Sequence, residues 1–191
     1  MTSVSKRCII SFMLINVTKV KSTAQSSERL NLAEVVDAAA YGYPELALQG
    51  PVQFVGQVEN AAPFLELHGQ VTGCLRLTCA RCLAQFGLTL QAEIAEAYTN
   101  KPEAMSEDDE YAVSFFEGDE IDIAPALLQA LLLELPMQPL CRPDCKGLCP
   151  DCGADLNQQP CTCNHQDIDI RFSKLQALLQ EMQGQQPEKE V

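Results

Sequence analysis

The side chains best suited to chemistry in this 191-residue chain are its ten cysteines, eight of which lie in two short segments. The segment TCARCL holds two of the eight, and the segment CRPDCKGLCPDCGADLNQQPCTC holds the other six. Two thiolates separated by two residues can point the same way from a tight turn, and four thiolates about 2.3 Å from one ion complete a tetrahedral zinc site. In CPDCG, Pro150 sets such a turn and Gly153 supplies the permissive dihedral after the second sulfur.

Six cysteines in the longer segment are more than one zinc ion binds, so we expect two sites. Four of the six follow the spacing of a zinc ribbon and form a complete set: Cys149, Cys152, Cys161 and Cys163. Cys141 and Cys145 remain and need partners, and TCARCL offers two more: Cys79 and Cys82. The hypothesis is a second four-thiolate site that closes a loop of roughly 60 residues, so that one or two Zn²⁺ bind per chain.

Two other uses of clustered cysteines compete with zinc, namely disulfides in a secreted protein and redox or catalytic thiols. Secretion needs a signal peptide, and Lys6 and Arg7 with the apolar run after them superficially look like one. Asn16, Lys19 and Lys21 interrupt that run early, and no apolar run reaches the roughly 18 residues of a membrane helix. We therefore expect a cytoplasmic protein without a membrane segment, in which thiols stay reduced and available to metal.

The remaining residues give no sign of catalysis. The chain has no Gly-rich phosphate loop, no nucleophile elbow and no HExxH motif, and four sulfurs per zinc leave no open position for water. Cys74 is expected to pack in a strand, and Cys8 lies in the N-terminal tail. His68 is expected to face solvent, and His165 could replace a sulfur ligand, although the sulfur set is the better choice. We expect a protein that is not an enzyme.

The net charge of -13 argues against non-specific binding of nucleic acid, which needs Lys and Arg to neutralise phosphates. A partner protein with a basic face fits this charge better. Several basic residues do lie near the cysteines in sequence, where they either compensate thiolate charge or form a weak positive patch. Direct contact with RNA is therefore left open.

Alternating apolar residues predict the elements that position the cysteines. Residues 13–19, 51–60, 64–78 and 86–98 have this period of two and are expected to form strands. The last two flank TCARCL, which places its cysteines at the tip of an antiparallel hairpin. Residues 31–48 carry no assignable pattern, and KSTAQSSERLN reads as a polar connection.

The sequence also predicts two helices and contains an acidic segment. Residues 122–135 predict a buried helix capped by Asp122, and residues 173–183 predict a second one capped by Ser173. Residues 103–122 hold nine carboxylates and no Lys or Arg. The segment is either a solvated loop kept open by its own charge or a surface for a basic partner.

These patterns predict an α+β fold, with an antiparallel β-sheet or partly closed barrel, a packed helix, a C-terminal zinc-ribbon-like module and a terminal helix. Met13 is a candidate for the true start of the chain. The expected divisions are a flexible tail at 1–12, a domain at 13–136 with its acidic loop at 103–122, a zinc-binding module with the C-terminal helix at 137–184, and a flexible tail at 185–191.

The combination of LTCARCL, IDIAPALLQALLLELPMQPLC and DCKGLCPDCGADLNQQPCTC resembles the YceD-like family of large ribosomal RNA subunit accumulation proteins. The resemblance covers residues 13 to about 182, and GLCPxCGxxLN is its most specific part. It implies a part in accumulation or processing of 23S ribosomal RNA (rRNA), without an established enzymatic activity. Some family members lack the ribbon but keep the first CxxC and the equivalents of positions 141 and 145, which supports pairing those four positions.

The resemblance leads to one main hypothesis and one alternative. The main hypothesis is a non-catalytic zinc protein that supports assembly of the large ribosomal subunit by binding a basic ribosomal protein or a precursor particle. The alternative is a zinc-dependent interaction module or redox-sensitive regulator unrelated to ribosomes.

Overall fold

The computed structural model describes residues 12–102, 113–163 and 178. The chain divides into two compact units, residues 1–145 and 146–191, and each is described by itself. The first unit extends beyond the predicted domain boundary at residue 136, so Cys141 and Cys145 belong to it. Apart from Leu178, the helix predicted over 173–183 lies outside the described residues, as do the tail at 185–191 and all of the tail at 1–12 except Phe12.

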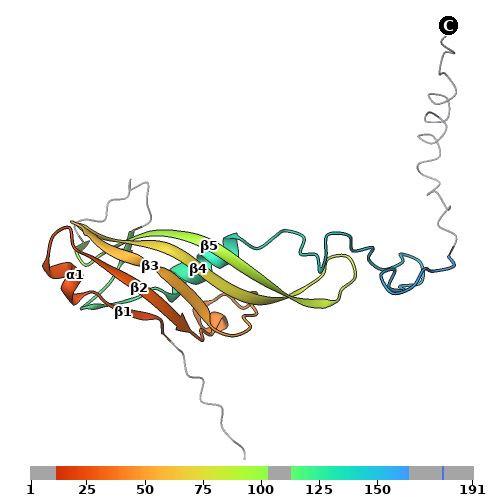
Figure 1. Cartoon of the computed structure of the whole chain (residues 1–191), viewed down its shortest axis with the longest axis horizontal. Helices are drawn as coiled ribbons and strands as arrows, with labels where there is room; N and C mark the ends of the chain where they lie inside the picture. The colour runs from red at the N-terminus through yellow and green to blue at the C-terminus, as the bar shows by residue number, and fades with distance from the viewer. Residues whose placement is uncertain (1–11, 103–112, 164–177, 179–191) are drawn as a thin grey trace, which may run out of the picture. The chain divides into compact units, whose positions relative to one another are not determined.

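The first unit is built on a curled sheet of five strands that resembles half of a barrel (Figure 1). The strands are β2 (Ser27–Glu34), β3 (Val52–Ala61), β4 (Phe64–Thr78), β5 (Gln85–Thr99) and β6 (Val113–Phe115), in that order across the sheet. Neighbouring strands are antiparallel except β6, which runs parallel to β5. The strands predicted over 51–60, 64–78 and 86–98 are confirmed.

Helix α2 (Ala124–Leu133) packs against β4 and β5, and the core lies between them. Along the central strands, alternate residues are buried or half-buried there, as the predicted alternation requires. The buried residues of β3, β4, β5 and α2 include Val52, Phe54, Val58, Leu65, Leu67, Val71, Leu75, Ala92, Ile94, Tyr98, Leu127, Leu128 and Leu131. Asp122 accepts a hydrogen bond from the amide of Ala124 at 3.1 Å, although the residue at the N-cap position is Ile123. None of the helices in the described part of the chain is long and apolar enough to cross a membrane.

The strand predicted over 13–19 is shorter than expected. Strand β1 (Leu14–Asn16) pairs with β7 (Glu120–Asp122) in a separate two-stranded sheet, and helix α1 (Thr18–Ser22) follows at once. The side chain of Asn16 accepts a hydrogen bond from the amide of Thr18 at 3.1 Å, which turns the chain out of the strand. The predicted alternation still holds, because Met13, Ile15 and Val17 are all buried.

Two other segments differ from the prediction. The stretch read as a polar connection forms most of β2, an edge strand, and the residues after it form the short 3-10 helix η1 (Ala38–Tyr41). The segment expected as an acidic loop contains β6 and β7 within residues 113–122. Its first ten residues, 103–112, lie outside the described part of the chain.

A pair of facing glycines lets β3 and β4 approach beneath an aromatic ring. Gly56 and Gly69 are cross-strand partners, and the ring of Phe54 covers both. A Cβ added at Gly69 would lie 2.6 Å from the carbonyl oxygen of Val55 and 2.8 Å from the Phe54 ring. The two positions therefore have room for a hydrogen atom and no side chain.

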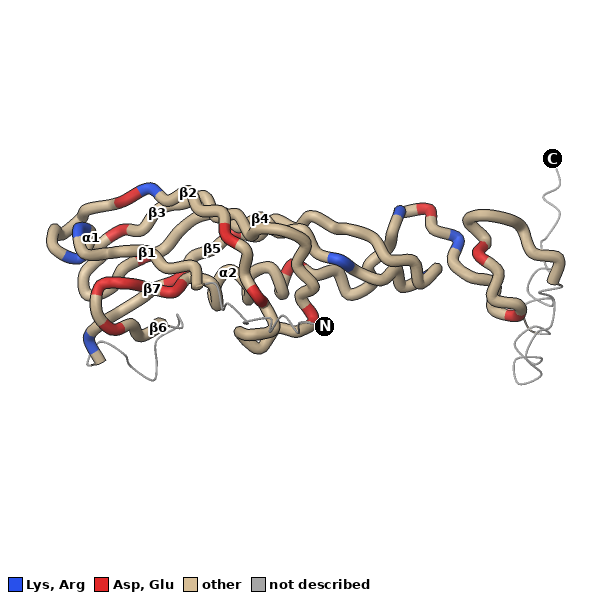
Figure 2. Tube along the Cα trace, turned by 90° about the horizontal axis from the view of Figure 1, so that it is seen from below, with Lys and Arg blue, Asp and Glu red and all other residues tan. Residues whose placement is uncertain are grey.

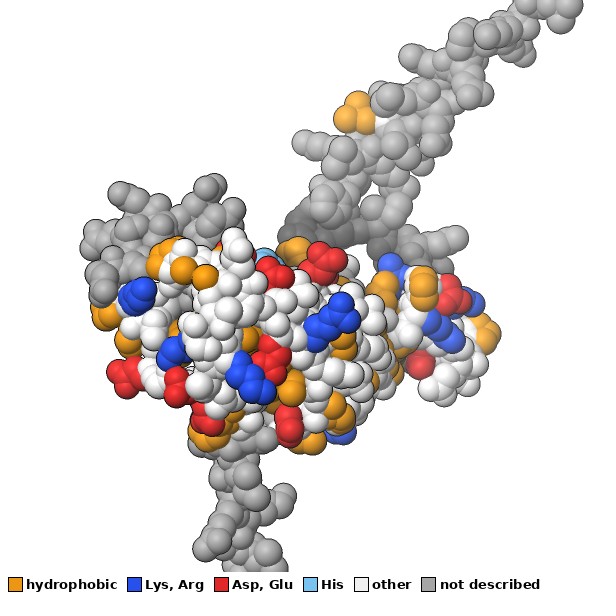
Figure 3. All heavy atoms as spheres, turned by 60° about the vertical axis from the view of Figure 1, so that its left-hand side comes forward, with side chains coloured by type: hydrophobic (Ala, Val, Ile, Leu, Met, Phe, Trp, Pro, Cys, Tyr) orange, Lys and Arg blue, Asp and Glu red, His pale blue; other side chains and the backbone are white. Residues whose placement is uncertain are grey.

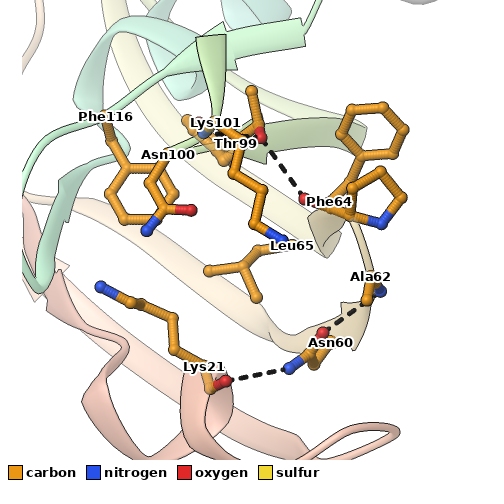
Figure 4. A pocket seen from close by; sticks show the side chains of 11 residues that line it. Lys21, Asn60, Ala62, Phe64, Leu65, Thr99, Asn100, Lys101 and Phe116 are labelled. Carbon is orange, nitrogen blue, oxygen red and sulfur yellow. Dashed lines mark hydrogen bonds between the residues drawn. The ribbon is translucent and has the colours of Figure 1, made fainter. Parts of the chain in front are cut away.

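The amide of Asn60 connects α1 to the end of the β3–β4 hairpin (Figure 4). Its nitrogen donates to the carbonyl oxygens of Val20 at 2.8 Å and Thr23 at 3.1 Å, and its oxygen accepts from the amide of Ala62 at 3.2 Å. Lys21 lines the same hollow, and its ammonium group donates to Asp119 at 2.9 Å, which neutralises its charge. The hollow is thus a structural junction.

Replacing Asn60 with alanine should lower the free energy of unfolding by about 1–3 kcal/mol, because the carbonyl oxygens of Val20 and Thr23 would each lose one of their donors. Urea unfolding followed by circular dichroism measures the change. Asn31→Ala, at an exposed position of β2, is the matched control and should change stability by less than about 0.5 kcal/mol. Equal effects of the two substitutions would contradict this role for Asn60.

Candidate metal centre

The first cysteine pair lies at the tip of the β4–β5 hairpin, as predicted. The amide of Cys79 donates to the carbonyl oxygen of Ala84 at 2.9 Å, and the amide of Leu83 donates to that of Cys79 at 3.0 Å. These bonds close a turn in which Leu83 has a φ of 59°, a left-handed conformation that non-glycine residues seldom adopt. The turn directs the sulfurs of Cys79 and Cys82 to the same side.

The second pair comes from the segment after α2, which lies against this tip. The amide of Ala80 donates to the carbonyl oxygen of Pro139 at 2.8 Å. The guanidinium of Arg81 donates to the carbonyl oxygen of Cys145 at 2.8 Å. These two hydrogen bonds hold the hairpin tip and residues 139–145 together, and they bring Cys141 and Cys145 to the first pair.

The sulfur atoms of Cys79, Cys82, Cys141 and Cys145 all lie within 4.8 Å of one another. The sulfurs of Cys79 and Cys145 are 3.8 Å apart, and those of Cys82 and Cys141 are 3.6 Å apart. Four sulfurs about 2.3 Å from a central zinc ion at tetrahedral angles lie roughly 3.8 Å from each other. A disulfide bond needs about 2.05 Å. The donor set and its spacing therefore fit a tetrahedral metal ion.

Backbone donors and burial act in opposite directions on the thiols of this first cluster. Cys79 and Cys145 are almost fully buried, and Cys141 is half-buried. The backbone N–H groups of Cys82 and Cys141 point at the sulfur of Cys79 and lower its pKa to about 6. Burial, followed by the neighbouring sulfur of Cys82, raises the pKa of Cys141 to about 12. A divalent cation among the four sulfurs would stabilise the thiolate form of each.

The second cluster lies within the second unit and repeats the turn of the first. The sulfurs of Cys149, Cys152, Cys161 and Cys163 lie within 4.8 Å of one another. The amide of Cys149 donates to the carbonyl oxygen of Ala154 at 2.8 Å, and the amide of Gly153 donates to that of Cys149 at 2.9 Å. Gly153 has a φ of 71°, so it occupies the left-handed position that Leu83 occupies in the first turn.

The second cluster is less buried than the first. Cys149 is buried, Cys152 is exposed, and the other two are half-buried. The backbone N–H of Cys152 donates to the sulfur of Cys149 at 3.5 Å and lowers the pKa of that thiol to about 6. Asn157 stabilises the loop between the cysteine pairs, because its side chain accepts from the amide of Lys146 at 2.8 Å and donates to Asp155 at 2.8 Å.

The structure thus groups the eight cysteines in the two predicted sets. Cys74 lies in β4 and belongs to neither set, as expected. His68 is partly exposed and lies 3.1 Å from the carboxylate of Glu66, and His165 lies outside the described residues. No pattern in the sequence indicates the hydrogen bond from Arg81, whereas Asn157 belongs to the GLCPxCGxxLN motif and could have been identified from it.

The charged side chains in the described part of the first unit are mixed in sign. Over the end of the sheet that carries α1, Lys and Arg side chains alternate with Asp and Glu (Figure 3). Such a mixture gives nucleic acid no continuous line of cations to contact. This face therefore does not favour direct binding of RNA.

Comparison with known proteins gives the same family as the sequence motifs. A family model described as large ribosomal RNA subunit accumulation protein YceD matches residues 67–179. An uncharacterised protein of Mycobacterium tuberculosis is 35% identical over 124 residues, 64% of this chain and 59% of the relative. The large ribosomal RNA subunit accumulation protein YCED homolog 1, chloroplastic, of Arabidopsis thaliana is 28% identical over 162 residues, 70% of this chain and 50% of the relative.

A third relative is the uncharacterised protein YlbN of Bacillus subtilis, which is 27% identical over 132 residues, 69% of this chain and 76% of its own length. The matched regions thus span half to three fifths of the first two relatives and about three quarters of the third. No solved structure matches this chain with significance. The family model includes the hairpin tip and both groups of cysteines.

Proposed function

Because this chain belongs to the YceD family of large ribosomal RNA subunit accumulation proteins, we propose that it supports accumulation of 23S rRNA as a non-catalytic, zinc-binding assembly protein. The observation that carries the zinc assignment is the pair of four-sulfur clusters. Zinc favours tetrahedral sulfur ligation and has no redox chemistry of its own. Each closed site would hold the chain in shape and leave no coordination position for a substrate.

The proposed role is to bind a partner during large-subunit assembly in the cytoplasm. The net charge of -13 favours a basic protein partner, for which ribosomal proteins that contact rRNA are the natural candidates. Zinc in the first cluster would fix the hairpin tip to residues 139–145, and zinc in the second would fold the short segment 149–163. Both segments would then offer defined surfaces to that partner.

Depletion of the protein tests this function. The ratio of 23S to 16S rRNA should fall by about half or more, measured on total RNA from depleted and replete cells, because unassembled rRNA is degraded. Wild-type protein should restore the ratio, and the Cys82→Ser variant, which lacks one first-cluster ligand, should restore it poorly. Cys74→Ser is the matched control and should restore it fully.

An unchanged ratio after depletion would reject the ribosomal role. Native affinity purification with zinc measured in the eluate would then show whether the chain is a zinc-dependent interaction module with another partner. If Cys82→Ser restored the ratio fully, the ribosomal role would not depend on the first cluster.

A further inference from the structure

A groove lined by apolar and acidic side chains lies beside α2 and includes none of the eight clustered cysteines. It has a volume of about 510 Å³, and β1, β6, β7 and α2 contribute to its lining. Three large apolar side chains in it are unusually exposed: Phe12 at 54%, Leu14 at 48% and Phe115 at 45%. A second hollow of about 210 Å³ between β5 and α2 shares Glu96 and Gln129 with it. The two hollows therefore adjoin.

The charges that line this groove all have one sign. Among the described residues that line the two hollows there are no Lys, Arg or His and six carboxylates: Glu93, Glu96, Glu117, Glu120, Asp122 and Glu134. Figure 2 shows acidic residues along β7, a strand whose residues line the larger hollow. None of the six forms an ion pair with any Lys or Arg in the described part of the chain.

Glu96 lies where the two hollows meet. Partial burial raises the pKa of its carboxyl group, because the charged form is removed from water, and no Lys or Arg of the described residues pairs with it. Asp122, in contrast, accepts a hydrogen bond from the hydroxyl of Tyr41 at 2.7 Å. A cationic side chain placed in the groove would supply what Glu96 lacks.

The edge of β5 that borders the smaller hollow has no strand partner among the described residues. Strand β6 pairs only with Ala97, Tyr98 and Thr99 of β5. In the described part of the chain, no strand pairs with the preceding residues of β5 on the side away from β4. Residues 92–96 line the smaller hollow. An open strand edge presents unpaired N–H and C=O groups to which an extended peptide can add.

We propose that this groove binds an extended, Lys- or Arg-rich segment of a partner protein, which adds to the open edge of β5. Alternate side chains of the segment would enter the groove, aliphatic ones against Phe115 and Leu14 and basic ones against Glu96 and Glu120. A basic segment is preferred over the chain's own residues 103–112, because those ten residues hold five carboxylates.

This inference deepens the proposed function, since ribosomal proteins carry basic segments that neutralise rRNA phosphates. The proposed function supplies only the identity of the partner. The binding itself is a property of the purified, zinc-loaded chain, so that it can fail while the ribosomal role stands.

The test measures fluorescence anisotropy of a labelled peptide of about ten residues that alternates lysine and valine, near physiological ionic strength, where long-range attraction is screened. The full-length protein should bind it in the micromolar range. The Glu96→Gln, Glu120→Gln double variant should bind about tenfold more weakly. The matched control, Glu34→Gln with Glu45→Gln, removes the same charge from exposed positions outside the groove and should stay within about twofold.

Two further measurements separate the groove from general attraction to an acidic protein. Phe115→Ser leaves the charge unchanged and should also weaken binding about tenfold. A peptide with alternate N-methylated amides keeps its side chains but cannot pair with β5, and it should bind about tenfold more weakly. Equal losses in the two double variants, or equal binding of the methylated peptide, would overturn the proposal.

Other occupants would give different results. A dimer of the free protein that Phe115→Ser converts to monomer, measured by analytical ultracentrifugation, would assign the groove to a second copy of the chain. Peptide binding that tightens about tenfold when residues 103–112 are replaced by a Gly-Ser linker would assign the groove to the chain itself. Either result would overturn the proposal, whereas neither bears on the 23S rRNA ratio after depletion.

Discussion

Replacing Cys145 with serine should lower the zinc content of the purified protein from two ions per chain to one and should destabilise the first unit. A serine hydroxyl is a poor zinc ligand, and Cys145 is almost fully buried in the first cluster. Its sulfur lies 3.8 Å from that of Cys79, 66 residues earlier in the chain. A cross-link closing a loop of this size contributes about 4 kcal/mol in the chain-entropy model, so the melting temperature should fall by roughly 10 °C.

Zinc measured by mass spectrometry of the digested protein and differential scanning calorimetry give the two readouts. Cys74→Ser makes the same replacement of sulfur by oxygen at a position in β4 outside both clusters. This variant should retain two zinc ions and the wild-type melting temperature. Cys161→Ser should also lose one ion but should leave the melting of the first unit unchanged, because its cluster lies in the second unit. Two zinc ions and unchanged melting in Cys145→Ser would refute the first site.

Replacing Gly69 with alanine should lower the free energy of unfolding by about 3 kcal/mol or more, at the upper end of what overpacking costs. The added Cβ would lie 2.6 Å from the carbonyl oxygen of Val55, 2.7 Å from the Cα of Gly56 and 2.8 Å from the ring of Phe54. The first two are backbone atoms of β3, which cannot rotate aside. Relief therefore requires that β3 and β4 separate, because a shift of the Phe54 ring would remove only the third of these contacts.

Gly87 in β5 provides the matched control. A Cβ there would meet only the side-chain amide of Gln49 at 3.3 Å and the sulfur of Cys74 at 3.7 Å. Both belong to side chains that can move, and glycine weakens a strand, so Gly87→Ala should change stability by less than about 1 kcal/mol. Urea unfolding of both variants decides the point, and a Gly69→Ala protein as stable as wild type would show that the glycine pair is not required.

The sequence predicted the central strands because their burial is strongly one-sided. Phe54, Leu67 and Ile94 alternate with polar or exposed neighbours, and a period of two is a direct consequence of one buried sheet face. The edge strand β2 escaped prediction because its inward residues, Leu30 and Leu32, are only partly buried and stand among Ser, Glu, Arg and Asn. An edge strand needs little apolar surface and so leaves a weak pattern.

The short strands β6 and β7 escaped prediction for a different reason. Each has three residues and lies in a segment whose many carboxylates indicate a solvated loop. Ile121 is buried and pairs with Ile15, but this single apolar contact is visible only once the chain is folded. Pairing between segments more than 100 residues apart in sequence leaves no local periodicity to read.

The grouping of the cysteines was predictable because ligand number and spacing restrict the choices. A zinc ion takes four sulfurs, and the six in the longer segment divide into a ribbon set and a pair that needs another pair. The supporting contacts were not predictable, because the bond from Arg81 to the carbonyl of Cys145 depends on how the hairpin tip meets residues 139–145. The boundary between the two units falls at Cys145 because residues 139–145 contact the hairpin tip.

The separation of the first cluster's sulfurs along the chain would set how long its first cysteine pair waits for the second during synthesis. At about 5–20 residues per second, the 66 residues from Cys79 to Cys145 take roughly 3–13 seconds to make. Until then the hairpin tip holds half a site, whose two thiols are open to oxidants and competing metals. The second cluster needs only residues 149–163, so it can capture its ion within seconds of emerging. The supply of metal in a growing cell would thus limit how many newly made chains complete their sites. The first unit would stay incomplete for longer than the second cluster.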